Sequence, residues 1–427
     1  MKYQKLFKNK NEYYTFAESE QYIEPNVSII LENTNADVKY SKPHFLTFKS
    51  KEENSTISFN RVGESTSVKN AALQYSTDGG QNWDDYTLGT TITLENVDDT
   101  VKFKGTNDSL SDGSSNYHKF VMTGKLTANG DVTSLFNETG DDYPLSNYSC
   151  CNLFSGCSSL QKAPSLPSTN LGTKCYYQMF KGCTSLTDSP ELPSLSIPAS
   201  GYAYMFEKCT SLTGAPELPA MQLSNHCYRG MFQNCSNLQT APQLNATGMS
   251  NSCYAYMFCN CSNLVNVQES LPAMEMKTRC YESMFHTCYH LLKAPELPAT
   301  TLADYCYAYM FQNNYGLLSA QTILPATTLK PYCYTEMFYD CPMMEKAPVL
   351  PALTLVNGCY TYLFTYCSKL NYIKAMFLTT PTASYTRDWW GGVCSAGTFV
   401  KNSQATWNVT ANYYGTPNGW TIETASE

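Results

Sequence analysis

A nine-residue stretch with the spacing CYxxMFxxC recurs nine times between residues 149 and 367, and this repeat constrains the fold more than any other feature. The last residues of the copies lie 26 residues apart, and the interval lengthens to 27 twice. The copies are SCCNLFSGC, CYYQMFKGC, GYAYMFEKC, CYRGMFQNC, CYAYMFCNC, CYESMFHTC, CYAYMFQNN, CYTEMFYDC and CYTYLFTYC. Because one such unit cannot bury its apolar residues alone, the sequence predicts a solenoid of about nine stacked units.

Within each copy the apolar residues recur at positions i, i+3, i+4 and i+7, as in Tyr254, Met257, Phe258 and Cys261. This spacing predicts an α-helix of two turns with one apolar face. A leucine follows three residues after the last cysteine in most copies, and then comes an extended segment of the form APELPA. In the two 27-residue units VQESLP and AQTILP replace APELP, so we expect a β-bulge there.

The predicted units have sides of unequal width. Packed helices need about 8 to 10 Å each, whereas neighbouring extended segments need only about 4.8 Å. The sequence therefore predicts an α+β solenoid that curves and presents a concave surface. The prolines of the extended segments predict a short or irregular sheet on that side, since proline cannot donate to a ladder of hydrogen bonds.

The spacing MFxxCxxLxxAPELPA resembles the BspA-type leucine-rich repeat, which occurs in surface proteins of gut anaerobes and their phages. The resemblance covers roughly residues 146–375 and implies a leucine-rich-repeat solenoid. Solenoids of this kind support many binding roles, so the resemblance points to a fold more than to a function.

The flanking segments follow other patterns, which divide the chain into four parts. Residues 46–130 contain alternating strands such as STISFNRV and TTITLENV, separated by turn signals, and predict a β-sandwich. Residues 131–375 hold the solenoid, and residues 376–427 predict a β-rich C-terminal cap, which a solenoid needs to cover its last unit. The cap tryptophans either pack in this cap or form a platform for glycans; they are Trp389, Trp390, Trp407 and Trp420.

Residues 1–45 are polar and predict an N-terminal anchoring arm. Their segment EPNVSIILENTNADVKYSK resembles the N-terminal segments of virion proteins from crAss-like and other phages of gut Bacteroides relatives. That resemblance implies a head fibre or appendage, made in the host cytoplasm, whose arm binds other virion proteins. It also implies a homo-oligomer, by analogy a trimer, whose solenoid binds a host-surface glycan or protein. The alternative is a bacterial cell-surface leucine-rich-repeat adhesin.

Several classes of function are not expected. A net charge of −8, without clustered Lys and Arg, disfavours nucleic acid as a partner. The opening residues lack the apolar run of a secretory signal, and no stretch approaches the roughly eighteen apolar residues of a membrane span, so we expect no membrane insertion. No catalytic or nucleotide-binding motif occurs, so we expect no enzyme, cofactor or metal site. His286 and His290 are four residues apart but are expected to be surface residues.

The cysteines follow the repeat. Two repeat positions hold most of the nineteen, and the second position predicts a structural thiol ladder of Cys157, Cys183, Cys209, Cys235, Cys261, Cys288, Cys341 and Cys367. Reduced, buried thiols are the leading interpretation, with inter-unit disulfides or metal as alternatives. Ser149, Gly201 and Asn314 replace cysteine without disturbing the period. Cys259 lies outside both positions and is expected to be exposed.

Two rows of residues are candidates for a ligand-contact surface. Tyr204, Tyr256, Tyr309 and Tyr362 recur beside the methionine and are interpreted either as half-exposed packing or as aromatic contacts for glycans and proteins. Glu191, Glu217 and Glu296 are expected to form an acidic row on the extended side.

Overall fold

The computed structural model describes residues 45–64, 71–137, 143–407 and 414–425, together with four short strands before residue 45. The chain divides into two compact units, Met1–His44 and Phe45–Glu427. In the first unit two antiparallel pairs form, β1 (Leu6–Asn9) with β2 (Glu12–Thr15) and β3 (Ser28–Ile29) with β4 (Tyr40–Ser41). Apart from these strands, the segment predicted to be an anchoring arm lies outside the described residues.

The second unit begins with two sheets that face each other. One has six strands in the order β13-β12-β5-β10-β7-β8, and the other has three in the order β11-β6-β9. The strands are β5 (Leu46–Ser50), β6 (Ser55–Val62), β7 (Leu73–Ser76), β8 (Asp84–Asp85), β9 (Thr91–Leu94), β10 (Thr100–Gly105), β11 (Tyr117–Thr123) and β12 (Leu126–Asn129). Phe120 of β11 lies 4.9 Å from Phe48 and 5.3 Å from Phe103 between ring centroids, so aromatic residues from both sheets fill the space between them.

The sheet pairing continues into the first repeat. A 3₁₀ helix, η1 (Val132–Leu135), follows β12, and β12 pairs in parallel with β13 (Leu160–Lys162). The ring of Phe120 stacks on Phe154 at 5.3 Å. The sandwich strands and the repeats therefore share one hydrophobic core across the boundary predicted at residue 130.

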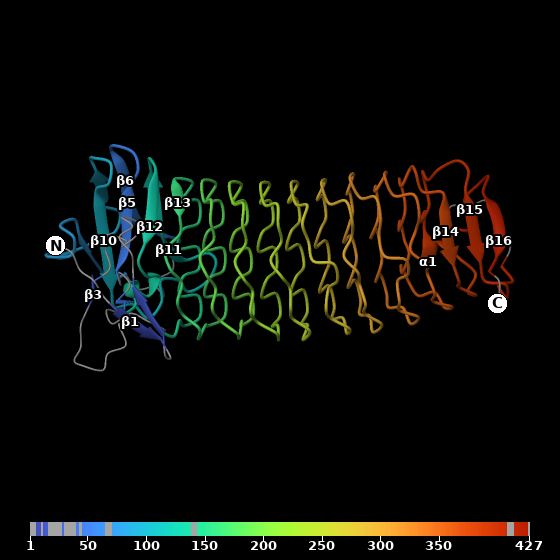
Figure 1. The fold of residues 1–427 in the computed structure, drawn as a ribbon, viewed down its shortest axis with the longest axis horizontal. Coiled ribbons are helices and arrows are strands. Elements are labelled where there is room, and N and C mark those ends of the chain that lie inside the picture. The colour runs from blue at the N-terminus through green and yellow to red at the C-terminus, as the bar shows by residue number, and fades with distance from the viewer. Residues whose placement is uncertain are drawn as a thin grey trace. The chain divides into compact units, whose positions relative to one another are not determined.

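The repeated stretches are not α-helices, so the predicted α+β class is wrong. Each stretch is a chain of β-turns in which every fourth residue has a positive φ, for example 52° at Ser252, 60° at Tyr256 and 61° at Asn260. Backbone N–H groups alternate between two kinds of partner. Met257 donates to the carbonyl of Tyr254 within its coil at 3.2 Å, and Phe258 donates to the carbonyl of Met284 in the next coil at 3.0 Å. The repeats are thus a β-rich ladder of turns (Figure 1).

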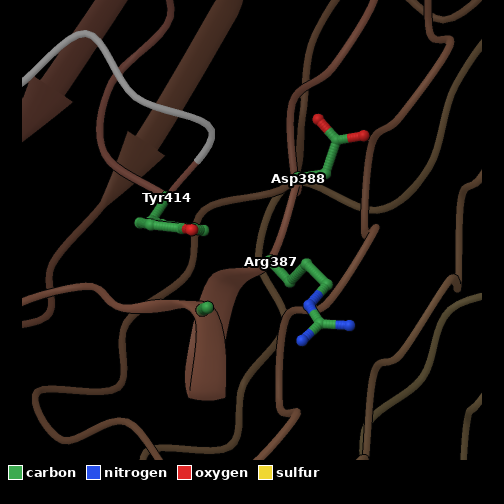
Figure 2. A pocket seen from close by; sticks show the side chains of 4 residues that line it. Arg387, Asp388 and Tyr414 are labelled. Atoms are coloured by element: carbon green, nitrogen blue, oxygen red, sulfur yellow. The ribbon is translucent and has the colours of Figure 1, made fainter.

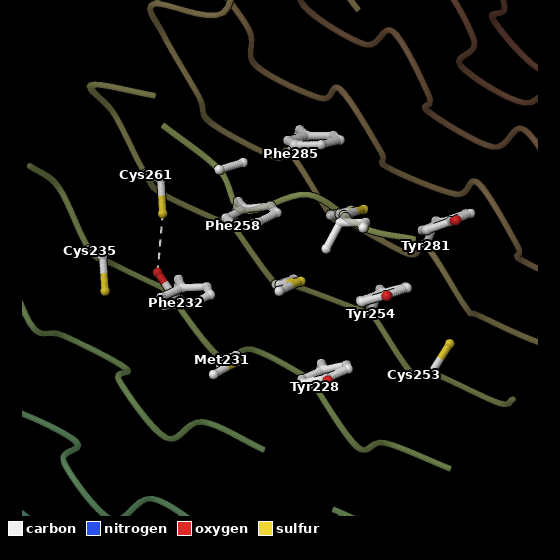
Figure 3. Packing of buried hydrophobic residues seen from close by; sticks show 14 of the residues in the cluster. Tyr228, Met231, Phe232, Cys235, Cys253, Tyr254, Phe258, Cys261, Tyr281 and Phe285 are labelled. Atoms are coloured by element: carbon white, nitrogen blue, oxygen red, sulfur yellow. Dashed lines mark hydrogen bonds between the residues drawn. The ribbon is translucent and has the colours of Figure 1, made fainter. Parts of the chain in front are cut away.

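Because the turns repeat every four residues, the side chains alternate in pairs. Two neighbouring residues point inward, the next two point outward, and the pattern repeats. Inward aromatic residues form continuous columns through successive coils (Figure 3): Phe258 lies 5.7 Å from Phe232 and 5.6 Å from Phe285. Tyr254 stacks on Tyr228 at 5.6 Å in a second column. Every ring in the two columns is almost fully buried, so these columns form the core of the solenoid.

Backbone hydrogen bonds also join the coils on the extended side, but there they form isolated parallel bridges such as Leu218 with Leu244 and Lys293 with Ser319. Since both sides of each coil bond directly to the next coil, neither side has the width of a packed helix. The physical reason for expecting a curved, concave solenoid is therefore absent.

Each 27-residue unit uses a glutamine to keep this pairing. The Leu244 N–H donates to the Oε1 atom of Gln268 at 2.7 Å, and the Nε2 atom of Gln268 donates to the Leu244 carbonyl at 3.3 Å. Gln321 makes the same pair of bonds with Leu297 in the other long unit. A side-chain amide thus takes the place of a backbone peptide where the chain has one residue more.

The turn ladder extends beyond the predicted end of the repeats at residue 375. The Tyr362 N–H donates to the Arg387 carbonyl at 2.8 Å, and the Phe364 N–H to the Trp389 carbonyl at 2.8 Å, so residues 384–392 form a further coil. The short helix α1 (Ala383–Thr386) overlaps the beginning of this coil. A parallel sheet covers the extended side; its strands are β14 (Tyr372–Ala375), β15 (Thr398–Lys401) and β16 (Thr421–Thr424). The four cap tryptophans are buried, which leaves none of them free as a glycan platform.

Candidate ligand-contact surface

The outward pairs of the turn ladder form one continuous surface, which we call the turn face. It consists of the outward residues of ten consecutive coils, 148–156, 174–182, 200–208, 226–234, 252–260, 279–287, 305–313, 332–340, 358–366 and 384–392. Its large side chains are mostly half-buried or exposed, while the inward pairs are buried. The repeat pattern alone does not predict this surface as a whole, because the same residues would lie on the solvated side of helices.

Tyr204, Tyr256, Tyr309 and Tyr362 all lie on the turn face, in every second coil, and are half-buried. The coils between them carry Gly230, Ser283 and Glu336 at the same position. A Cβ atom on Gly230 would lie 2.4 Å from the ring of Tyr204, so this ring covers the glycine of the next coil. Alternation of a large and a small residue thus gives a tyrosine room to lie across two coils.

Arg229 joins two of these tyrosines. Its Nε atom donates a hydrogen bond of 2.8 Å to the hydroxyl of Tyr204, and its guanidinium lies 4.8 Å from the ring centroid of Tyr256. The contact with the ring is a cation–π interaction, which orients the planar guanidinium. Tyr204, Arg229 and Tyr256 form one arrangement across three coils, which we call the arginine clamp.

The charge of the turn face changes along the solenoid. Coils from 148–156 to 279–287, the N-terminal half, carry the cations Lys174, Lys181, Lys208, Arg229 and Arg279 and the carboxylates Glu207 and Glu282. Coils from 305–313 to 384–392, the C-terminal half, carry one cation, Arg387, and the carboxylates Glu336, Asp340 and Asp388. The N-terminal half is therefore positive and the C-terminal half negative.

Both carboxylates of the N-terminal half have a cation partner. Glu207 accepts a contact of 2.9 Å from Lys181, and Glu282 pairs with Arg279, whose guanidinium also lies over the Tyr305 ring at 4.2 Å. Burial raises the pKa of Glu282 above its usual value, while the charge of Arg279 lowers it. In the C-terminal half burial raises the pKa of Glu336 and of Asp388.

The structure does not bring the predicted acidic row to the tyrosines. Glu191, Glu217 and Glu296 are exposed on the extended side, outside the turn face. Glu191 and Glu217 lie in neighbouring coils, but Gln243 and Ser270 hold the equivalent positions before Glu296. The acidic row is thus a pair followed by an isolated residue.

The predicted thiol ladder lies inside the coils, where its eight cysteines are buried and free of disulfides. Each thiol donates to the carbonyl of a phenylalanine in the preceding coil or strand. Cys261 bonds to Phe232 at 3.1 Å (Figure 3), and Cys235 bonds to Phe206 at 3.0 Å. Burial raises the pKa of Cys157 and of Cys367 to about 12, so both thiols keep their protons at neutral pH. These thiols are hydrogen-bonded parts of the core.

Asn314, which replaces a cysteine of this ladder, keeps its hydrogen bond. The Nδ2 atom of Asn314 donates to the Phe285 carbonyl at 2.9 Å, and its Oδ1 atom accepts from the Cys288 N–H at 2.6 Å. A buried amide is satisfied here because it has both a donor and an acceptor. The sequence alone shows the exchange but not the bond that permits it.

Cys259 is not exposed, which corrects the expectation from the sequence. It lies on the turn face but is only 4% exposed, and its Sγ atom is 3.8 Å from the Nδ1 atom of His286 in the next coil. Burial raises the pKa of Cys259 to about 11 and lowers that of His286. The pair is therefore a neutral thiol beside a neutral imidazole, without the thiolate that nucleophilic catalysis requires.

An open hollow of 380 Å³ lies beside the last coil and is lined by Ala383, Arg387, Asp388 and Tyr414. Figure 2 shows the Asp388 carboxylate directed away from the Arg387 guanidinium. Asp388 is the one carboxylate among these four lining residues, whereas most glycosidases use a pair. In the described ranges no three His, Cys, Asp or Glu side chains are grouped so as to hold a metal ion, and no helix there is long and apolar enough to span a membrane.

Comparisons with known proteins add little to this description. No protein-family model matches the sequence, and no curated protein matches it. Among solved structures the chain is similar to a leucine-rich repeat protein from Bacteroides ovatus ATCC 8483, with 14% sequence identity, a TM-score of 0.34 and coverage of 64% of this chain. The match spans 63% of that protein, which is less than two thirds of its length. The repeat architecture described above therefore rests on the turn ladder itself.

Proposed function

We propose that the chain is a binding protein whose turn face contacts a glycan or protein on a host surface. The arginine clamp is the observation that carries this proposal. A tyrosine fixed across two coils presents a large amphipathic contact area and has little side-chain entropy left to lose on binding. A non-enzymatic role fits the same surface, since its carboxylates are paired with cations or dispersed over several coils.

We further propose that this binding protein is a structural component of a phage virion, a head fibre or appendage. The support is the resemblance of residues 1–45 to virion proteins, which would make this segment the attachment to other virion proteins. A homo-oligomer, by analogy a trimer, would present several turn faces at once and raise the avidity for a repetitive surface. A bacterial cell-surface adhesin is the second candidate, supported by the resemblance of the repeat to surface proteins.

Two experiments test these proposals. Fluorescent full-length chain should bind to intact gut Bacteroides cells, and the Tyr256→Ala variant should bind at least several-fold less, whereas Tyr75→Ala, which lies outside the turn face, should bind like the wild type. Equal binding by all three proteins would contradict a role for the turn face.

Mass spectrometry of purified phage particles should detect peptides of the chain; their presence only in bacterial envelope fractions would favour the adhesin.

A further inference from the structure

The cations of the N-terminal half of the turn face differ in whether they form an ion pair with a carboxylate. Lys181 and Arg279 are paired with Glu207 and Glu282, so these four charges are largely compensated. Lys174, Lys208 and Arg229 make no direct ion pair among the described residues, although the charge of Arg229 also lowers the pKa of the Glu282 carboxyl. They come from three consecutive coils, with Lys174 at the first position of its nine-residue stretch, Arg229 at the fourth and Lys208 at the ninth.

Lys174 and Arg229 are also held by aromatic rings. The Nζ atom of Lys174 lies 5.8 Å from the Tyr148 ring centroid and 5.5 Å from that of Tyr177. The arginine clamp uses the Nε atom of Arg229, and among the described residues nothing accepts a hydrogen bond from its terminal nitrogens. A guanidinium fixed in this way can present its two terminal nitrogens side by side to a carboxylate or sulfate group.

The whole chain has a net charge of −8, so a positive surface on it is a local feature. Nucleic-acid binding relies on many phosphate contacts, whereas this surface offers three cations without a direct ion pair, interleaved with tyrosines. Tyrosine combines an apolar ring with a hydroxyl, which suits a sugar ring with its own hydroxyl groups. Sparse charge beside aromatic residues therefore favours a glycan over a nucleic acid.

We propose that the N-terminal half of the turn face binds an acidic polysaccharide, with its carboxylate or sulfate groups on Arg229, Lys208 and Lys174 and its sugar rings on the tyrosines. This inference rests on the proposed binding function and specifies its ligand class. The C-terminal half, which is negative, repels the same polymer and so limits the site to one end of the solenoid.

The test measures binding of the full-length chain to immobilised hyaluronan, chondroitin sulfate, dextran and single-stranded DNA. We expect binding to the first two polymers, weakened by added salt, and none to neutral dextran. Arg229→Gln should weaken that binding roughly tenfold, which corresponds to about 1.4 kcal/mol. Arg387→Gln, which removes an exposed cation from the C-terminal half, should leave it unchanged within about twofold.

Tyr204→Phe provides a second variant that keeps the ring and removes the hydroxyl that orients Arg229. It should weaken binding to both acidic polymers by about threefold, since the guanidinium remains but is less fixed. Stronger binding to DNA than to either acidic polysaccharide, or equal losses in Arg229→Gln and Arg387→Gln, would overturn the inference. If the chain binds host cells but neither acidic polymer, the inference is wrong and the proposed function stands; if it binds neither, both are wrong.

Discussion

At the scale of single residues, the buried side chains of the repeat are selected by hydrogen bonds as well as by size. The thiol of Cys261 and the amide of Asn314 both donate to a phenylalanine carbonyl in the preceding coil. The sequence predicted a ladder of buried thiols. It also showed that asparagine can replace cysteine in this ladder without disturbing the period, but not why. The exchange is possible because the amide replaces the thiol as a donor and also accepts the Cys288 N–H.

Replacing Asn314 should separate packing from hydrogen bonding. Asn314→Ala leaves the Cys288 N–H and one bond of the Phe285 carbonyl without a buried partner, and we expect a loss of about 2 to 4 kcal/mol in unfolding free energy. Asn314→Cys restores the common residue of the ladder and should lose less than half as much. Urea unfolding followed by tyrosine fluorescence measures both; equal losses in the two variants would show that the bond contributes nothing.

Gly230 is required by the tyrosine that covers it. It has a φ of 56°, and an added Cβ atom would lie 2.4 Å from the Tyr204 ring. Gly230→Ala should therefore destabilise the protein by about 1 to 3 kcal/mol through strain and a displaced ring. Gly214→Ala is the matched control, because nothing lies within 4 Å of its Cβ position. A thermal shift of equal size in the two variants would contradict the close contact.

At the scale of one element, the repeated stretch shows how far a short pattern can be interpreted. Residues spaced i, i+3, i+4 and i+7 fit a helix with 3.6 residues per turn, and they fit equally a chain of turns with a period of four. The two periods diverge too little over eight residues to be distinguished by the apolar positions. The outward positions distinguish turns from a helix. One column of equivalent positions contains Asn234, Asn260 and Asn313, together with Gly156 and Gly182. Asparagine and glycine tolerate a positive φ, which an α-helix does not use.

The depth of the thiols within the coil predicts a simple labelling result. Eighteen of the nineteen cysteines are buried and Cys394 is half-buried. Maleimide at neutral pH should therefore add once to the folded chain, at Cys394, and to every cysteine after unfolding. Intact-mass measurement of the wild type and of Cys394→Ser checks this. An adduct on Cys259 in the folded protein would show that its place on the turn face is open.

At the scale of the whole molecule, one hydrophobic core runs through Phe45–Glu427, from the first sheets to the cap. The sequence predicted the order of its parts, because strand alternation, the repeat and the tryptophan-rich end are all visible in the residues. It did not predict that the parts share sheet pairing and aromatic stacking, since contacts between segments such as Phe120 and Phe154 leave no local pattern. The arginine clamp could not be predicted either, because its three residues come from different coils and leave no local pattern.

This core should make the protein sensitive to alkali. Burial raises the pKa of thiols such as Cys157 to about 12 from 9.0. Above about pH 9 the unfolded chain releases protons that the folded chain keeps, so stability falls by about 1.4 kcal/mol per pH unit for each such group. The urea midpoint should therefore drop steeply between about pH 9 and 11. A midpoint independent of pH in this range would contradict the burial of the thiols.

The spacing of the coils tests the central claim most directly, because the turn face exists only if turns and not helices are stacked. Lys208 and Asp340 hold equivalent turn-face positions five coils apart. Spin labels on cysteines at these two positions, in a Cys394→Ser background, allow their separation to be measured by double electron–electron resonance. Stacked turns at about 4.8 Å per coil predict a separation of roughly 24 Å. A separation of roughly 40 to 50 Å, as packed helices would produce, would contradict the turn ladder.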